Sequence, residues 1–209
     1  MQDTKNTLIV ESQYLPTVSL FKKVDSVLNV KIEQYEYYQK FSFRNRCFLS
    51  GPNDILSLSV PLEEGRNQKC LIRDVRISYG EKWQPRHWRS IHDAYRKSPF
   101  FEEYMDDIKS FFETKPVFLF DWNWMWIEWL VKQSGIKTTI GLTSEYVPDY
   151  PGEFIDYRNK ITPKTYLIEA TSLPVYVQVF GNKQPFMPNL SFLDMLLCNG
   201  PASVKLFRQ

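Results

Sequence analysis

His87 is the residue of this 209-residue chain best suited to acid–base chemistry, because the sequence holds only two histidines. Imidazole titrates near neutral pH without a large shift of its pKa. His87 lies between Trp83 and Trp88, just after Pro85, a residue that favours the first turn of a helix. The helix dipole there disfavours imidazolium, so we expect a lowered pKa. A histidine that merely packs in the first turn is the alternative.

Two arginines flank an asparagine in the segment Arg44-Asn45-Arg46. On an extended strand the two guanidinium groups share one face and the amide lies on the other. Paired guanidinium groups recognise carboxylate or phosphate, whereas a solvated strand face is the alternative interpretation. Arg73 shares a predicted strand face with the apolar residues of the run 71–78. It is therefore paired internally, placed at an edge, or part of a binding site.

A third polar group precedes the last predicted helix, in the segment Asn189-Leu190-Ser191-Phe192-Leu193-Asp194. The spacing of Ser191 and Asp194 is that of a capping box, in which side chains satisfy the free backbone N–H groups of a helix. The alternative is that this helix N-terminus faces an anionic ligand.

Several classes of chemistry are not expected. The 26 basic and 24 acidic residues give a net charge of +2, too little for a protein dominated by phosphate contacts with nucleic acid. None of the 8 glycines stands in a dinucleotide-binding or P-loop pattern. His87 and His92 are five residues apart, about 140° around a helix, so they cannot easily share a metal. We therefore expect neither a metal site nor a cofactor.

The aromatic content is high, with 15 Phe, 12 Tyr and 6 Trp, and most of these rings are expected in the core. The run Val117–Val131 is the most apolar part of the chain, but it is too short and too polar to cross a bilayer. The segment Met1–Asn6 is polar and does not resemble a secretory signal. The three cysteines form no C-x-x-C pair and suit a reducing compartment, so we expect a cytoplasmic protein.

The elements that must position these residues begin with a predicted β-α-β unit. Hydrophobic periodicity then indicates a hairpin, a further strand, a central run of three helices and a short last helix. Ser98 and Pro99 are read as the N-cap and first residue of the second central helix, and Gly135 as the end of the third. We expect one α/β or α+β domain over residues 1–209, with a mixed β-sheet. The predicted strands are 7–11, 30–34, 41–50, 55–60, 71–78, 138–143, 166–168 and 175–180, and residues 146–163 read as loop.

The order of these motifs resembles the WbqC-like family along nearly the whole chain. One departure concerns the segment Val10-Glu11-Ser12-Gln13, which lacks the histidine and first proline that many members carry there, so no role of that histidine transfers. The resemblance rests on Gln13-Tyr14-Leu15-Pro16, Phe21-Lys22-Lys23, Arg44-Asn45-Arg46, Asp74-Val75-Arg76-Ile77, His87-Trp88, Ala94-Tyr95, Ser98-Pro99-Phe100-Phe101, Pro188-Asn189-Leu190-Ser191, Asp194-Met195-Leu196-Leu197 and Asn199-Gly200-Pro201.

The resemblance implies a place in the synthesis of O-antigen or related surface polysaccharides. It implies transfer of an aminoacyl group, such as glycine, or an acyl group to an amino sugar, with a nucleotide-linked sugar as the small-molecule substrate. A non-catalytic binding or accessory protein of such a pathway is the alternative. Neither the donor, the acceptor nor the oligomeric state follows from the sequence.

In the enzyme interpretation His87 takes the proton of the attacking amine. Arg44 and Arg46 hold a carboxylate or phosphate, while Asn45 and Asn189 orient polar groups of the substrate. The family-matching residues expected to complete the substrate-binding site are Gln13, Tyr14, Arg73, Tyr95, Ser191 and Asp194.

Overall fold

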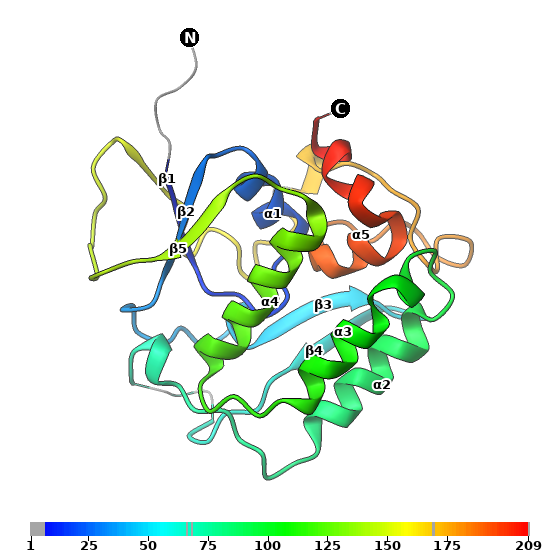
Figure 1. Ribbon diagram of the computed structural model, residues 1–209, viewed down its shortest axis with the longest axis horizontal. Coiled ribbons are helices and arrows are strands. Elements are labelled where there is room, and N and C mark those ends of the chain that lie inside the picture. The colour runs from blue at the N-terminus through cyan, green and yellow to red at the C-terminus, as the bar shows by residue number, and fades with distance from the viewer. Residues whose placement is uncertain (1–6, 66, 68, 169, 209) are drawn as a thin grey trace.

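A parallel β-α-β unit opens the fold, as the sequence predicts. Strand β1 (Thr7–Glu11) is followed by helix α1 (Val18–Asp25) and strand β2 (Asn29–Glu33). Thr17 caps α1, because its hydroxyl accepts a hydrogen bond from the backbone N–H of Leu20. The crossover through α1 lets the two strands run parallel (Figure 1).

The computed structural model describes residues 7–208 apart from Arg66, Gln68 and Glu169. The segment Met1–Asn6, which is not expected to be a secretory signal, lies outside the described residues. No helix in the described part of the chain is long and apolar enough to cross a bilayer.

Four parallel strands form the main sheet in the order β5-β2-β1-β6. Strand β5 (Thr139–Leu142) was predicted, whereas β6 (Phe154–Asp156) lies in the segment 146–163 that was wrongly read as loop. Only three residues of β6 pair with β1, so the segment is too short to show strand periodicity in the sequence. Its place beside β1 puts β1 in the interior of the sheet.

The predicted hairpin is confirmed as strands β3 (Arg46–Ser50) and β4 (Ile55–Ser59), which pair antiparallel as a separate two-stranded sheet. The predicted first strand began too early, because Phe41 has a positive φ of 56° and residues 41–45 form turns and bends. Parallel and antiparallel pairing both occur, which agrees with an α/β protein of mixed pairing.

The predicted strand over 71–78 is wrong. Ile72–Asp74 forms the 3₁₀ helix η1, and the residues around it make isolated bridges to three different segments. Because each of these residues pairs with a different segment, the run 71–78 forms no continuous ladder of strand hydrogen bonds. Arg73 is consequently exposed, with its guanidinium 3.7 Å from Asp74 and 4.8 Å from the ring of Tyr35.

The three central helices are present as α2 (Trp83–Tyr95), α3 (Phe101–Glu113) and α4 (Leu119–Ser134). Gly135 ends α4 with a φ of 69°, as predicted. The predicted cap of α3 is wrong, because Phe100 occupies the N-cap and the hydroxyl of Ser98 donates instead to the carbonyl of Tyr95.

The last helix, α5 (Phe192–Asn199), is present and is followed by the 3₁₀ helix η3 (Gly200–Arg208). The predicted strands 166–168 and 175–180 are wrong, since these segments contain turns and irregular backbone around the short helix η2 (Ala170–Ser172).

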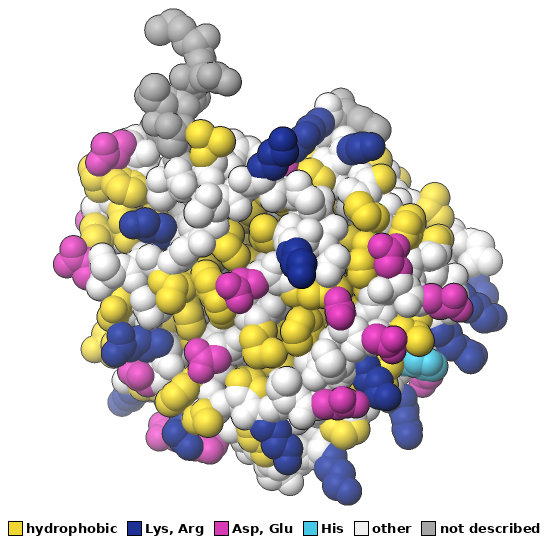
Figure 2. All heavy atoms as spheres, in the orientation of Figure 1, with side chains coloured by type: hydrophobic (Ala, Val, Ile, Leu, Met, Phe, Trp, Pro, Cys, Tyr) yellow, Lys and Arg dark blue, Asp and Glu magenta, His cyan; other side chains and the backbone are white. Residues whose placement is uncertain are grey.

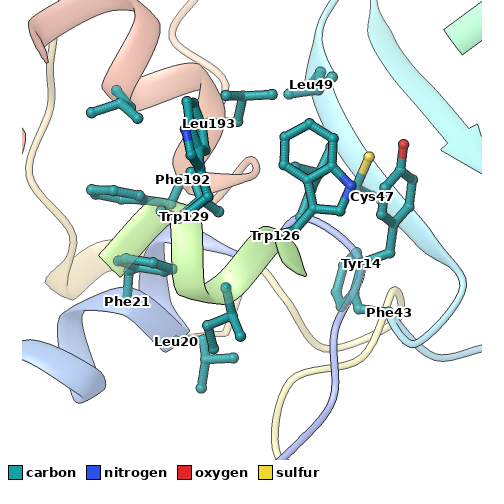
Figure 3. Packing of buried hydrophobic residues seen from close by; sticks show 14 of the residues in the cluster. Tyr14, Leu20, Phe21, Phe43, Cys47, Leu49, Trp126, Trp129, Phe192 and Leu193 are labelled. Atoms are coloured by element: carbon teal, nitrogen blue, oxygen red, sulfur yellow. The ribbon is translucent and has the colours of Figure 1, made fainter. Parts of the chain in front are cut away.

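Aromatic rings dominate the contacts between the central helices. Trp122 on α4 packs edge-on against Trp83 and Trp126 at ring-centroid distances of 5.5 and 5.7 Å. The core continues to the N-terminal unit, where Tyr14 lies beside Cys47 (Figure 3). On the face shown in Figure 2, basic and acidic side chains are interspersed around these elements. Trp122, Trp126 and Trp129 of α4 are at most 7 % exposed, so the expectation that aromatic rings lie in the core is confirmed for this helix.

Candidate functional site

The strands of the parallel sheet end in polar residues at one edge. Glu11 ends β1, Glu33 ends β2, Asp156 ends β6, and Thr143 directly follows β5. Because the strands are parallel, their carboxyl ends meet at the same edge, where ligands bind in many open α/β sheets. We call this set, with Glu36 and the two arginines described next, the carboxyl-edge network.

Glu36 and Arg44 form a buried ion pair of this network. The guanidinium donates to the carboxylate over 2.6 and 2.9 Å, and the two side chains are 6 % and 1 % exposed. Arg44 also donates to Oδ1 of Asn159 over 2.8 Å. Burial raises the pKa of Glu36 to about 7; Arg44 opposes the rise, and the nearby carboxylates of Glu11 and Glu33 add to it.

Arg158 is the second cation of the carboxyl-edge network. It donates to Glu33 over 3.3 Å and to Asp156 over 2.6 and 2.9 Å. Its guanidinium also donates to the backbone carbonyls of Val147 and Pro148. Arg158 therefore ties the segment that follows β5 to the ends of two strands.

Gln13, a predicted binding residue, is engaged within the same region. Its amide donates to Glu11 over 2.7 Å and accepts from the backbone N–H of Thr17. The other carboxylate oxygen of Glu11 accepts from the backbone N–H of Asn159 over 2.9 Å. Gln13 is only 3 % exposed, so it joins the end of β1 to the start of α1.

His87 lies in an aromatic pocket on α2. Its Nδ1 is 3.2 Å from the hydroxyl of Tyr14, whose ring stacks on the imidazole at 6.0 Å and 19°. Trp83 and Phe112 approach edge-on at 5.1 and 6.3 Å. Burial, with a smaller contribution from Arg86, lowers the pKa of His87 to about 4. The predicted direction is confirmed, with burial as its largest cause, and the imidazole is neutral at physiological pH.

The base of the hairpin lies next to His87. A hydrogen bond joins His87 to the backbone of Ser59, the residue paired with Arg46 across the hairpin. Asn45 is fixed beside it: its amide donates to the carbonyl of Val60 over 3.0 Å and accepts from the hydroxyl of Tyr38 over 3.1 Å. The three segments that carry His87, Tyr14, and Asn45 with Arg46 therefore meet at the base of the hairpin, and we call this region the hairpin-base site.

Arg46 differs from its neighbour Arg44. Its side chain is half-buried, and its Nε is a buried donor without an acceptor among the described residues. Burial raises the pKa of the Tyr38 phenol, and Arg46 and Arg44 both oppose this rise. Of the two arginines, Arg46 is therefore the one with a hydrogen-bond donor that the described part of the protein does not use.

Tyr95 and Asp194 meet in a different place. The hydroxyls of Tyr95 and Tyr176 donate to the two oxygens of Asp194, each over 2.6 Å, and Gln178 donates over 3.2 Å. Burial raises the pKa of Asp194. Its carboxylate thus bridges side chains from other segments instead of completing a capping box. Ser191 does cap α5, accepting from the backbone N–H of Leu193 over 3.2 Å.

Asn189 lies apart from the hairpin-base site. Its Oδ1 accepts from the backbone N–H of Ser19 over 2.9 Å, and its amide donates to the carbonyl of Tyr166. It has a φ of 55° and is 2 % exposed. The side chain therefore joins α1 to the segment before α5.

Sequence reasoning missed Glu36, Arg158 and Tyr38. For Glu36 the available signal was a charged residue just beyond the end of a predicted strand, and Glu11 and Glu33 show the same signal. For Arg158 there was no such signal, because the strand before it was not predicted. No three histidine, cysteine, aspartate or glutamate side chains within the described ranges are placed to hold a metal ion. None of the three cysteines forms a disulfide bond.

This architecture defines an α/β protein with a small parallel sheet, charged residues at its carboxyl edge and a histidine beside an attached hairpin. The chain belongs to the WbqC-like protein family, which it matches over residues 11–169. The matched range includes the carboxyl-edge network and the hairpin-base site, whereas Asn189, Ser191 and Asp194 lie beyond it. No curated protein and no solved structure matches the chain.

Proposed function

We propose that this protein is a cytoplasmic transferase that modifies precursors of surface polysaccharides. It moves an aminoacyl group, such as glycine, or another acyl group onto the amine of a nucleotide-linked sugar. The hairpin-base site is its reacting centre. Two neighbouring features of the hairpin carry the proposal. The neutral His87 bonds to the backbone of Ser59 on one strand, and Arg46, which has an unsatisfied donor, is the residue paired with Ser59 on the other strand.

The state of His87 supports a role as proton acceptor. With its pKa lowered to about 4 by burial, the imidazole has one unprotonated ring nitrogen throughout the physiological pH range. The hydroxyl of Tyr14 at 3.2 Å is placed to pass a proton to Nδ1. When an amine attacks an acyl carbonyl, a C–N bond forms, the bond to the leaving group breaks, and the amine loses a proton that this pair takes up.

Arg44 and Arg46 have different roles in this proposal, although the sequence suggested the same role for both. Arg44 is held by Glu36 and Asn159, so it fixes the turn that leads into β3. Arg46 retains donor capacity and is the group that holds the carboxylate or phosphate of the substrate. Asn45, fixed by Tyr38 and Val60, keeps the backbone beside Arg46 in place.

Transfer assays on the purified chain test this proposal, with radiolabelled glycyl donors and amino-sugar nucleotides as substrates. We expect His87→Asn to lower kcat by about 100-fold or more, in the range of general-base catalysis. Arg46→Gln is expected to raise KM by about tenfold, the value of one charge-assisted hydrogen bond. Arg73→Gln is the matched control, because Arg73 is exposed and lies outside the site.

Unchanged transfer by His87→Asn on a confirmed substrate would remove His87 from the mechanism. A non-catalytic binding protein of the same pathway is the second candidate, favoured by the engagement of Arg44, Gln13 and Asn189 within the fold. It predicts that a nucleotide sugar raises the melting temperature without any transfer, and that Arg46→Gln removes the rise.

A further inference from the structure

A cavity of about 210 Å³ lies between the main sheet and the segment 143–151 that follows β5. Lys31 of β2 and Phe154 of β6 line it from the sheet, and Ser144, Glu145 and Tyr150 line it from the segment. Figure 1 places this segment and helix α2, which carries His87, on opposite sides of the molecule. The cavity is therefore separate from the hairpin-base site.

The segment over the cavity is held in a defined position. Arg158 donates to two of its carbonyls, at Val147 and Pro148, over 2.9 and 3.1 Å. The same guanidinium lies between the rings of Tyr146 and Tyr150, 5.1 and 5.0 Å from their centroids. At its start, Thr143 donates to Glu33 over 3.0 Å and accepts from the backbone N–H of Gln34. The walls of the cavity are thus preformed.

Most polar side chains that line the cavity have no hydrogen-bond partner among the described residues, in contrast to Thr143, which also lines it and helps to hold the segment. Among the described residues, Lys31, Ser144 and Glu145 make no side-chain hydrogen bond or ion pair, and the hydroxyl of Tyr150 has no hydrogen-bond partner. Thr143 and Arg158, which hold the segment, instead form hydrogen bonds with groups of the protein. A preformed hollow lined by uncommitted polar groups has the composition of a binding site.

The chemistry of these groups restricts the ligand. The ammonium of Lys31 attracts an anionic group, whereas Ser144 and Glu145 suit hydroxyl groups, since a carboxylate accepts hydrogen bonds from them. Tyr150 and Phe154, with ring centroids 5.2 Å apart, offer apolar faces to a ring. The volume is below the ~300 Å³ at which pockets for drug-sized ligands begin, so the ligand has a single ring.

We propose that this cavity binds a small anionic polyol, a hydroxylated single ring that carries a phosphate or carboxylate, with the anion at Lys31. The proposal does not depend on the transfer reaction or on His87. Phosphate and carboxylate are both compatible with an ammonium partner, so the test includes one ligand of each kind.

Isothermal titration of the full chain with glucose 6-phosphate, glucuronate, glucose and inorganic phosphate tests the site. At least one of the two anionic sugars is expected to bind more tightly than either glucose or inorganic phosphate. Lys31→Gln is expected to weaken that binding by about tenfold, the value of a charge-assisted hydrogen bond. Lys115→Gln is the matched control, because Lys115 is also an exposed lysine without a described ion pair but lies between α3 and α4.

His87→Asn is expected to keep full affinity in this titration, so loss of transfer and loss of binding are distinguishable. The proposal is overturned if neither anionic sugar binds at millimolar concentration, or if Lys31→Gln and Lys115→Gln have equal affinities. Equal affinities for glucose 6-phosphate and inorganic phosphate, without binding of glucuronate, would also overturn it, because the ring would then contribute nothing. Ser144→Ala removes a hydroxyl with no internal partner. It is expected to lower the affinity for the anionic sugar by about threefold and to leave the affinity for inorganic phosphate unchanged.

Discussion

The carboxyl-edge network and the aromatic pocket of His87 are both buried and polar, but they are stabilised in different ways. In the network, the carboxyl group of Glu36 and the guanidinium of Arg44 form a buried pair joined by several hydrogen bonds, and burial raises the pKa of Glu36 to about 7. In the aromatic pocket, the imidazole of His87 is uncharged and its ring contacts are aromatic. One region holds a buried arginine by pairing it with a carboxyl group, and the other surrounds an uncharged ring with aromatic side chains.

This difference predicts how the two regions respond to change. A buried ion pair is sensitive to the loss of one partner, because the remaining charge is left without compensation. A buried neutral imidazole is sensitive to pH, because protonation places a charge among aromatic rings. Substitutions and pH therefore separate the two regions.

The largest effect is expected for Arg44→Leu. This change leaves the carboxyl group of Glu36 buried without its cation and without the hydrogen bonds from Arg44, so we expect the free energy of unfolding to fall by about 3–5 kcal/mol. Urea denaturation at pH 7 measures the loss. Arg73→Leu is the control and should cost less than about 1 kcal/mol, because its contact with Asp74 is exposed. A loss below about 1 kcal/mol for Arg44→Leu would show that the pair does not stabilise the turn.

The second effect concerns the pH dependence that His87 contributes. Its pKa is about 4 in the folded protein and near 6.5 in the unfolded chain, so the unfolded state binds more protons between these values. The unfolding free energy of wild type minus that of His87→Gln should therefore rise by up to about 3 kcal/mol from pH 4 to pH 6.5. Chemical denaturation at several pH values measures this difference. A flat difference would contradict the burial of a neutral imidazole.

The same measurement on Glu36→Gln should give the opposite slope. The folded pKa of about 7 lies above the unfolded value of 4.5, so the stabilising contribution of the bound proton is complete below pH 4.5. It is lost as the pH rises to 7, and wild type minus variant should fall by up to about 3 kcal/mol. Slopes of the same sign in both variants would show that the two regions do not differ as described.

The smallest effect is expected for Tyr14→Phe. This change keeps the stacked ring and removes only the hydrogen bond to Nδ1 of His87, so it should lower the unfolding free energy by about 1 kcal/mol. Thermal or urea denaturation measures it. Tyr37→Phe, at an exposed tyrosine, is the matched control and should have no measurable effect. A loss above about 3 kcal/mol would mean that the hydroxyl has further partners that stabilise the fold.

The sequence predicts those parts of the fold that local patterns determine. The β-α-β unit, the hairpin around Gly51-Pro52-Asn53-Asp54 and the helix that ends at Gly135 all follow from periodicity and turn residues within the element itself. Strand β6 and the irregular run 71–78 are different, because their structure depends on partners far away in the chain. No local pattern carries that information.

For the candidate site, the sequence identifies the residue types but not their partners. His87 and Arg46 were selected by their chemistry, and the structure brings their segments together at the hairpin. Arg44 was expected to behave like Arg46, yet Glu36, eight residues away, occupies its guanidinium. Which of two neighbouring arginines is buried depends on the turn at residues 41–45, which the extended pattern did not predict.

The position of β6 has a consequence for how the chain folds. Ile9 of β1 pairs with Asp156 of β6, so one side of the first strand finds its partner only when most of the chain has been synthesised. Until then, that side exposes free N–H and C=O groups that can pair with another chain. Contacts between residues so far apart also slow folding, because a long loop must close first. We therefore expect the sheet to close late, with the nascent protein vulnerable to aggregation along that strand.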